Sequence, residues 1–366
     1  MRRIPGWPRR VGRRGPRTRK EGALVRLEIH QIKLPLRRVF AISRSSITEQ
    51  ESVIVELHDQ GKIGLGEAAK SSYYGQDAES IAGALERIKP ELAKHDFTTP
   101  EALWDFAAPL LEDNYFALSA LDQAAHDLYG KLNSTSVYQR NGLSWRNVPQ
   151  SSVTISIGPL EEVLSEVESY ADWPILKVKL GTPNDLEIVT ALRQNTDAIL
   201  RVDANCAWTV EETIRNSHAL AELGVEFIEQ PLPYDAPERS KRTVFEESAL
   251  PIIADESCQR EHHVRECDGL FHGINIKLCK CGGLTPAYRM LREASMRGLK
   301  TMVGCMIESD VAISAAAQLV PLLDFADLDG AFLLASQPAD GVKLERGTFS
   351  RPEGYGCGVT WDASLV

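Results

Sequence analysis

The sequence predicts an α/β fold: a (β/α)₈ (modified TIM) barrel with an α+β capping domain formed by the N-terminal region and a C-terminal segment. After Pro149, short β-branched runs, each followed by a helical pattern, recur at intervals of roughly 25 residues. Charged residues close most of these runs, as expected where a barrel builds its site from strand ends. Before Pro149, alternating strand-like runs come first and helical patterns follow.

The length of 366 residues suits a barrel of roughly 200–250 residues with a smaller companion. We expect the capping domain over residues 25–145 and the barrel over residues 150–334. Residues 335–366 are rich in glycine and contain no further βα unit. We therefore expect this last segment to fold back on the capping domain.

The capping domain begins with β-like runs between Val25 and Glu56, followed by a glycine-rich turn and the GLGEA segment around Glu67. Three helical patterns come next, and the clearest has apolar residues three or four positions apart between Ala117 and Leu132. This order predicts a small antiparallel sheet covered by helices.

Eight runs qualify as barrel strands: SVTISI (152–157), ILKVKL (175–180), AILRVDAN (198–205), VEFIEQ (225–230), PIIADES (251–257), GINIKL (273–278), KTMVGCM (300–306) and LLDFADLD (322–329). Their regular alternation with helical stretches favours a closed parallel barrel over an open doubly wound sheet.

The N-terminal tail differs from the rest of the chain. Residues 1–20 hold eight arginines and Lys20 with no acid, although the whole chain has a net charge of −10. Such a stretch cannot bury apolar surface, so we expect residues 1–24 to be a disordered tail. We interpret it as an extension outside the native protein, with a transit peptide or a nucleic-acid-binding arm as alternatives.

Composition excludes several classes of protein. The apolar fraction of 43% and charged fraction of 25% are those of a globular chain. The longest apolar run, 311–323, is shorter than the roughly 20 residues that a bilayer requires, so we expect no membrane partner. Seven scattered cysteines form no disulfide framework, which favours a cytoplasmic location. Outside the tail the chain is acidic, which disfavours nucleic acid as a partner.

Three carboxylates close successive strand runs. Asp203, Glu229 and Asp255 are spaced 26 residues apart, so each stands at an equivalent height in the predicted barrel. Oxygen ligands without His or Cys favour Mg²⁺, with Mn²⁺ as a substitute. The alternative is that each acid only caps the helix that follows it.

Lysines flank these carboxylates on both sides. Lys177 and Lys179 are two residues apart on one strand, so both point into the barrel. Repulsion between two ammonium groups predicts that the pKa of one falls from about 10.4 towards the range of a general base. Lys277 closes the sixth run and would face the opposite side of a bound substrate. A base on each face suits removal and return of a proton.

These strand ends resemble the enolase superfamily, and specifically its muconate lactonizing enzyme subgroup, from Val25 onward. The motifs that carry the resemblance are LKVKLG, VDANCAW, EQP, ADES and INIKLCKCGG. Within the subgroup the sequence is most similar to dipeptide epimerases, on the evidence of GCMIES (304–309) and of Asp327-Leu328-Asp329. Asp327 and Asp329 project the same way and could bind the free ammonium of a dipeptide, or could simply cap the turn before Gly330.

The resemblance implies a mechanism and further site residues. The substrate carboxylate would bind the metal, and Lys179 and Lys277 would exchange the α-proton of the C-terminal residue through an enediolate that Lys177 and the metal stabilise. Substrate contacts would come from Cys305 and Met306, and from a lid with Arg44 and the Tyr73-Tyr74 pair. Arg44 could grip a glutamate side chain or be a solvated loop residue.

Other functions remain open at this point. Asp310 follows GCMIES where the glutamate-selective prototype resembles a lysine-bearing version, so an acid there would oppose an anionic side chain. Cycloisomerisation, o-succinylbenzoate synthesis and N-acylamino acid racemisation use the same frame, and a non-catalytic binding protein is a further alternative. The sequence does not specify the dipeptide side chains, the pathway or the oligomeric state, with a homo-oligomer among the alternatives.

Overall fold

The computed structural model describes residues 25–42 and 45–365. Its first unit is an antiparallel sheet in the order β1-β2-β3, formed by β1 (Arg26–Ile42), β2 (Ser45–Asp59) and β3 (Lys62–Ala69). Gln60 and Gly61 join β2 to β3 with φ values of 48° and 73°, the paired left-handed conformation of a tight hairpin turn. The tail over residues 1–24 lies outside the described residues.

Helices cover one face of this sheet. They are α1 (Ala78–Leu92) and α3 (Tyr115–Asn133), and α2 (Pro100–Ala107) and the short α4 (Val137–Arg140) pack against α3. Helix α3 lies very close to β3, because a Cβ added at Gly66 would meet the carbonyl oxygen of Ala120 at 1.9 Å. The absence of a side chain at Gly66 therefore sets the spacing between sheet and helix.

The eight predicted barrel strands are confirmed. They run in one parallel sheet as β4 (Val153–Ile155), β5 (Ile175–Lys179), β6 (Ile199–Asp203), β7 (Val225–Glu229), β8 (Ile252–Ala254), β9 (Gly273–Ile276), β10 (Lys300–Gly304) and β11 (Phe325–Asp327). Ser151, just before β4, makes a parallel bridge to Ala326 of β11. This bridge closes the sheet into a ring.

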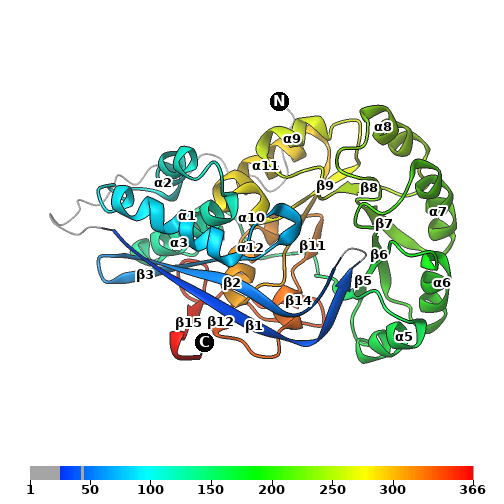
Figure 1. The fold of residues 1–366 in the computed structure, drawn as a ribbon, viewed down its shortest axis with the longest axis horizontal. Helices are drawn as coiled ribbons and strands as arrows, with labels where there is room; N and C mark the ends of the chain where they lie inside the picture. Colours follow the sequence, from blue (N-terminus) through cyan, green and yellow to red (C-terminus); the bar gives the residue numbers. More distant parts are fainter. Residues whose placement is uncertain (1–24, 43–44, 366) are drawn as a thin grey trace.

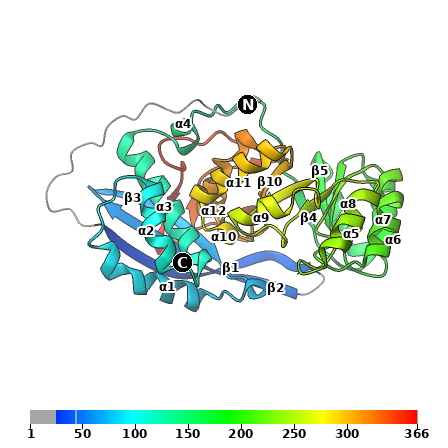
Figure 2. The same ribbon diagram turned by 90° about the horizontal axis from the view of Figure 1, so that it is seen from above.

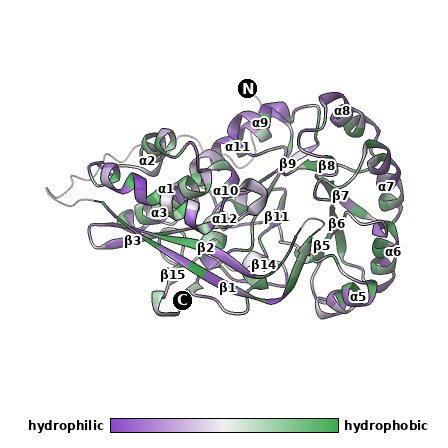
Figure 3. Cartoon of the chain, in the orientation of Figure 1, coloured by the Kyte–Doolittle hydropathy of each residue, from purple (hydrophilic) through white to green (hydrophobic). Residues whose placement is uncertain are grey.

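Helices alternate with the strands and form the outer wall of the barrel (Figure 1). They are α5 (Leu160–Ser169), α6 (Asp185–Asn195), α7 (Val210–Glu222), α8 (Glu238–Glu247), α9 (Glu261–Glu266), α10 (Leu278–Cys281), α11 (Leu284–Arg297) and α12 (Asp310–Ala317). Helices α5 to α8 mix hydrophobic and hydrophilic residues in Figure 3, as expected for helices that bury one side. No helix of the described residues is long and apolar enough to cross a bilayer.

The C-terminal segment contacts the capping domain. It contains β12 (Ala339–Asp340), β13 (Leu344–Glu345), β14 (Thr348–Phe349) and β15 (Thr360–Trp361). The N–H of Cys357 donates to Asp127 of α3 at 2.8 Å, and Trp361 donates to Glu56 of β2 at 2.7 Å. The far ends of β1 and β2 reach in the other direction, towards the barrel (Figures 1 and 2), where the N–H of Ile157, just after β4, donates to the carbonyl oxygen of Ala41 at 3.1 Å. Both domains therefore meet at the carboxyl ends of the barrel strands.

Candidate active site

The ends of β5, β6 and β7 bring two lysines and two carboxylates together. Lys179, Asp203 and Glu229 are register partners on adjacent strands, so they stand at one level of the barrel. Lys177 Nζ lies 2.7 Å from Glu229 Oε2 and 3.2 Å from Asp203 Oδ2. Lys179 Nζ lies 2.7 Å from the same oxygen of Asp203. Both carboxylates are completely buried, so these ammonium groups compensate charges that water cannot reach.

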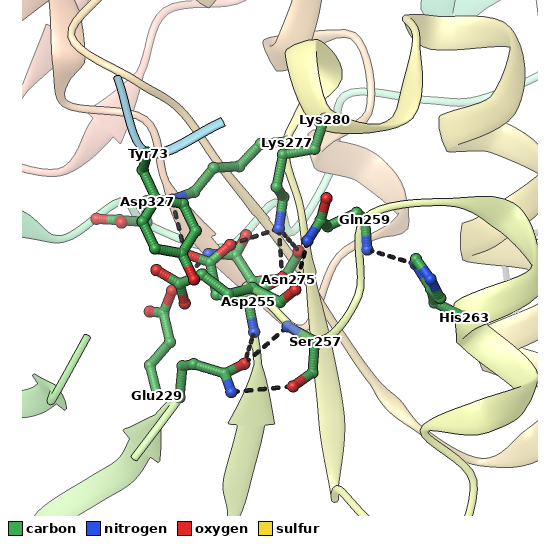
Figure 4. A network of polar contacts seen from close by, with 12 residues as sticks. Tyr73, Glu229, Asp255, Ser257, Gln259, His263, Asn275, Lys277, Lys280 and Asp327 are labelled. Atoms are coloured by element: carbon green, nitrogen blue, oxygen red, sulfur yellow. Dashed lines mark hydrogen bonds and ion pairs between the residues drawn. The ribbon is translucent and has the colours of Figure 1, made fainter. Parts of the chain in front are cut away.

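A third carboxylate, Asp255, follows β8 and contacts two further lysines. Lys277 Nζ lies 2.8 Å from Asp255 Oδ2. Lys280 contacts the other carboxylate oxygen and also donates to the carbonyl oxygens of Asp255 and Asn275, at 2.7 and 3.1 Å. Asn275 Nδ2 in turn donates to Glu229 Oε1 at 2.7 Å. Figure 4 shows this network, which links the second carboxylate to the third.

The backbone turns sharply after the first two carboxylates. Asn205, Cys206 and Gln230 have φ values of 46°, 68° and 35°, which are uncommon for residues other than glycine and concentrate at functional sites. The Gln230 side chain accepts the N–H groups of Asp255 and Ser257 at 2.9 and 3.1 Å. It thereby fastens the end of β7 to the loop that follows β8.

The three carboxylates have the chemistry of a site for a hard divalent cation, because they offer buried oxygen donors without His or Cys. Burial raises the pKa of Glu229 to about 7, and the charge of Asp203 adds to the rise. Glu229 Oε2 makes no hydrogen bond of good geometry, although it forms the ion pair with Lys177 described above. The oxygens of the three groups do not all lie within 4.8 Å of one another, and each carboxylate contacts a lysine. A cation would relieve the repulsion that these lysines partly offset.

The lysine pKa values depart from the sequence-based expectation. Burial alone would lower the pKa of Lys177, but three carboxylates outweigh burial and hold the pKa well above its usual value: Asp327, Glu229 and Asp203. Lys177 is therefore not the lysine whose pKa falls. At Lys277 burial is likewise outweighed, chiefly by Asp255, and the pKa is raised. Both lysines carry their protons in this arrangement of charges.

Asp327 and Asp329 lie at the end of β11, beside β4. Asp327 Oδ2 lies 2.7 Å from Lys177 Nζ, and its other oxygen accepts the Ser152 hydroxyl at 2.7 Å. Asp329 accepts the N–H of Thr154 at 2.7 Å. Burial, followed by the charge of Asp327, raises the pKa of Asp329 to about 6. Asp329 therefore has less compensating charge than Asp327, which already has a lysine partner.

A cavity of about 480 Å³ lies between the barrel mouth and the capping domain. The side chains around it include those expected from the sequence on the barrel side: Lys177, Lys179, Lys277, Cys305, Met306, Asp327 and Asp329. The capping domain adds apolar and aromatic groups, Phe40, Ile42, Ile47, Tyr73 and Tyr74, together with six polar or charged ones: Glu49, Gln50, Glu51, Lys70, Ser71 and Ser72. Arg44, which the sequence places in the same hairpin, lies outside the described residues.

Asp310 is not among the residues that line this cavity. It begins α12 and lies 2.8 Å from Lys343 of the C-terminal segment. The expectation that its charge opposes an anionic substrate is therefore wrong, because Asp310 is turned to a lysine outside the cavity.

Sequence reasoning did not single out several residues that hold the site in place: Ser152, Thr154, Gln230, Asn275 and Lys280. Strand alternation could have found three of them, because Asn275 shares a face with Lys277, and Ser152 shares one with Thr154. Gln230 and Lys280 fall within the EQP and INIKLCKCGG motifs, but strand alternation gives them no role, because their partners lie in the loop after β8.

The chain belongs to the enolase superfamily. Residues 161–365 match the family of enolase C-terminal domain-like proteins. Residues 25–142 match the N-terminal domain of mandelate racemase and muconate lactonizing enzyme. Its similar relatives in this superfamily include dipeptide epimerases.

An L-Ala-D/L-amino acid epimerase of Flavobacterium johnsoniae is 46% identical over 92% of this chain and 99% of its own length. Among solved structures, the dipeptide epimerase of Methylococcus capsulatus, in complex with Mg and L-Arg-D-Lys, has a TM-score of 0.85 and 32% identity, covering 92% of this chain and 100% of that one. The L-Ala-D/L-Glu epimerase of Bacillus subtilis, in a substrate-liganded complex, has a TM-score of 0.87 and 28% identity, covering 92% and 98%.

Proposed function

We propose that this protein is a metal-dependent dipeptide epimerase that inverts the α-carbon of the C-terminal residue by a two-base proton transfer. One observation carries the proposal. Lys179 ends β5 and Lys277 directly follows β9, which are four strands apart in the eight-stranded ring. The two lysines therefore face each other across the barrel, and both line the cavity. An α-carbon bound between them would present one face to each ammonium or amine group.

The proton transfer involves only the substrate and the two lysines: one proton is removed from the substrate and one is returned to it. One lysine, in its neutral form, takes the α-proton, and the electrons of the broken C–H bond move into the substrate carboxylate to give an enediolate. The other lysine, in its charged form, returns a proton to the opposite face. Lys177, buried beside the site and charged, supplies positive potential to the carboxylate as its negative charge grows.

We assign Asp203, Glu229 and Asp255 as the ligands of Mg²⁺, with Mn²⁺ as a substitute. The cation supplies Lewis-acid stabilisation to the substrate carboxylate. The carboxylates also act on the bases: Asp203 lies 2.7 Å from Lys179, and Asp255 lies 2.8 Å from Lys277. Asp203 and Asp255 would share their charge with a bound cation and would then hold the protons of Lys179 and Lys277 less strongly.

Asp327 and Asp329 are assigned to the free N-terminal ammonium of the dipeptide. Both are buried and line the cavity, so the ammonium would enter a place of concentrated negative charge. Asp329 contributes more to this selection, since Asp327 is already paired with Lys177. An N-acylamino acid has no ammonium and would leave Asp329 uncompensated.

The residues that line the cavity determine which substrate side chains it can accept. Phe40, Ile42, Ile47 and Leu333 form an apolar part of the cavity wall, which suits an apolar side chain. Glu49, Glu51 and Lys70 line the cavity as well and leave room for a polar one. The relative from Flavobacterium johnsoniae, named for L-Ala followed by varied amino acids, supports L-Ala dipeptides as the first substrates to test.

The test is a library of dipeptides incubated with the enzyme and Mg²⁺ in D₂O, with mass spectrometry as the readout. We expect one deuterium at the α-carbon of the C-terminal residue and the appearance of the second epimer. N-acetylated amino acids are the matched comparison. Exchange in these compounds but in no dipeptide would overturn the dipeptide assignment.

A further inference from the structure

Two glutamates and two histidines lie together on the capping sheet, far along the sequence from the barrel carboxylates. Glu28 and Glu56 are direct partners in the register of β1 and β2. His30 and His58 lie two residues further along each strand, on opposite sides of the glutamate pair because the strands are antiparallel, and all four side chains share one face. The opposite face of these strands belongs to the apolar core of the capping domain, through Leu27, Val55 and Leu57. We call the four polar residues the His-Glu cluster.

Three of the four residues in the His-Glu cluster lie close enough together to bind a single small ion, and His58 lies beside them. Glu28, His30 and Glu56 each offer a ligand atom, and these atoms all lie within 4.8 Å of one another. His30 Nε2 lies 3.6 Å from Glu56 Oε1, and His58 Nε2 lies 3.6 Å from Glu28 Oε2. Neighbouring donors around a tetrahedral Zn²⁺ with bonds of about 2.1 Å are separated by about 3.4 Å. Small side-chain shifts would therefore bring Glu28, His30 and Glu56 to a shared ion, and a turn of the His58 side chain would add it as the fourth ligand.

The cluster has polar groups that the protein leaves incompletely satisfied. The Nε2 atoms of His30 and His58 are buried and make no hydrogen bond of good geometry, although His58 Nε2 lies 2.9 Å from Glu56 Oε2 as an ion pair. Two carboxylates directly opposite each other in a sheet repel. Arg26 contacts Glu28, but its side chain is 62% exposed, so solvent screens this contact. A cation among the four side chains would address both the repulsion and the buried nitrogens.

Trp361 of β15 covers and orients the cluster. Its Nε1 donates to Glu56 Oε1 at 2.7 Å, and its ring lies edge-on to the His30 ring with 5.0 Å between centroids. Hydrogen bonds to ligand carboxylates fix the orientation of metal ligands and raise metal affinity. The C-terminal strand therefore provides an outer contact of the kind that metal sites use.

We propose that the His-Glu cluster is a second metal site, which takes a transition metal of the Zn²⁺ class and is separate from the barrel carboxylates. Two imidazole nitrogens with two carboxylates form a tetrahedral nitrogen and oxygen set that Zn²⁺ accepts, whereas Mg²⁺ prefers oxygen ligands alone. Arg26 Nη2 lies 3.3 Å from His58 Nδ1. Arg26 turns to solvent when the His58 Nε2 lone pair binds metal, because Nδ1 then carries the proton. The ion joins β1 to β2 and, through Trp361, strengthens the attachment of β15.

The test uses full-length, tag-free protein saturated with Mg²⁺ and titrated with Zn²⁺ by calorimetry. We expect one tight Zn²⁺ site per chain. The double variant His30→Gln/His58→Gln should bind Zn²⁺ at least about a hundredfold more weakly and keep the catalytic activity of the unmodified protein. Pulsed EPR with Cu²⁺ should show imidazole nitrogen coupling, which the double variant loses. The barrel carboxylates cannot produce this signal.

Two further variants separate metal binding from damage to the fold. His262→Gln/His263→Gln removes a second pair of neighbouring histidines, on α9, and should leave Zn²⁺ affinity unchanged. Trp361→Phe keeps all four ligands and should weaken Zn²⁺ about tenfold. The proposal is overturned if the unmodified protein binds no Zn²⁺ in the presence of Mg²⁺, or if the His30→Gln/His58→Gln variant binds Zn²⁺ as tightly. Neither result depends on which reaction the barrel catalyses.

Discussion

Lys280 holds Asp255 at two points, through a contact with the side-chain carboxylate and a hydrogen bond of 2.7 Å to the backbone carbonyl oxygen. Lys280 is 1% exposed, so its ammonium group interacts with these protein groups and not with solvent. Lys277 contacts the other carboxylate oxygen of Asp255. Lys280 therefore positions Asp255 relative to the base on the same side of the barrel.

Lys280→Met should weaken the metal site while leaving the substrate contacts in place. Outer contacts of this kind are typically worth about 10- to 100-fold in metal affinity, so we expect a loss of that size in Mg²⁺ affinity by calorimetry. Lys300→Met is a matched control, because Lys300 pairs with Asp324 in a largely exposed position. Unchanged Mg²⁺ affinity in a folded Lys280→Met protein would show that Lys280 has no positioning role.

Glu229→Gln should remove metal-dependent turnover without unfolding the protein. Burial favours the neutral form of Glu229, whose pKa is raised to about 7, and glutamine imitates that form. We therefore expect the metal-free variant to melt at the temperature of the metal-free unmodified protein or above. Mg²⁺ should raise the melting temperature of the unmodified protein but not of the variant, since only bound ligand adds stability. Turnover by the variant, or full activity of the unmodified enzyme after exhaustive chelation, would remove Glu229 or the metal from the mechanism.

Asp327 and Asp329 should select for a free ammonium, to different degrees. We expect kcat/KM for a good dipeptide to exceed that for its N-acetyl form on the order of a thousandfold, or about 4 kcal/mol. Asp329→Asn should erode this preference mainly by raising KM. Asp327→Asn should also lower kcat, because it removes a partner of Lys177 at 2.7 Å. Comparable kcat/KM values for both substrates in the unmodified enzyme would contradict the assignment.

Two glycines in the capping domain give opposite stability predictions. A Cβ at Gly66 would meet the Ala120 carbonyl oxygen at 1.9 Å, whereas a Cβ at Gly83 of α1 has nothing within 4 Å. Gly66→Ala should destabilise the fold by about 1–3 kcal/mol. Gly83→Ala should stabilise it by up to about 1 kcal/mol, because alanine favours the helix. Urea unfolding of the two variants checks both signs, and a Gly66→Ala protein as stable as the unmodified one would contradict the close packing of β3 on α3.

The sequence was sufficient to predict the barrel and to bring its functional side chains together. Each barrel strand is a short apolar run, and the residue that ends it points into the mouth, so Lys179, Asp203 and Glu229 could be placed side by side without coordinates. The same reasoning separated Lys179 from Lys277 across the ring, since four strands lie between them in the chain order.

The remaining features depend on contacts between distant segments. Asp310 pairs with Lys343, and neither strand periodicity nor a motif connects these two positions. The raised pKa of Lys177 arises from three carboxylates on separate strands. From the sequence, the only influence considered on this pKa was repulsion from the neighbouring Lys179. The His-Glu cluster could not be predicted from the sequence for the same reason. It forms only because β1 pairs with β2 in this register and because Trp361 of the C-terminal segment contacts Glu56.

The most direct test of the two-base mechanism is α-hydrogen exchange in D₂O, followed by NMR for each epimer separately, with Lys179→Ala and Lys277→Ala. Neither variant should epimerise the dipeptide, because each lacks the group that serves one face of the α-carbon. One variant should exchange the α-hydrogen of the L epimer alone and the other that of the D epimer alone. Epimerisation at the unmodified rate by either variant, or exchange of both epimers by a single variant, would contradict the mechanism.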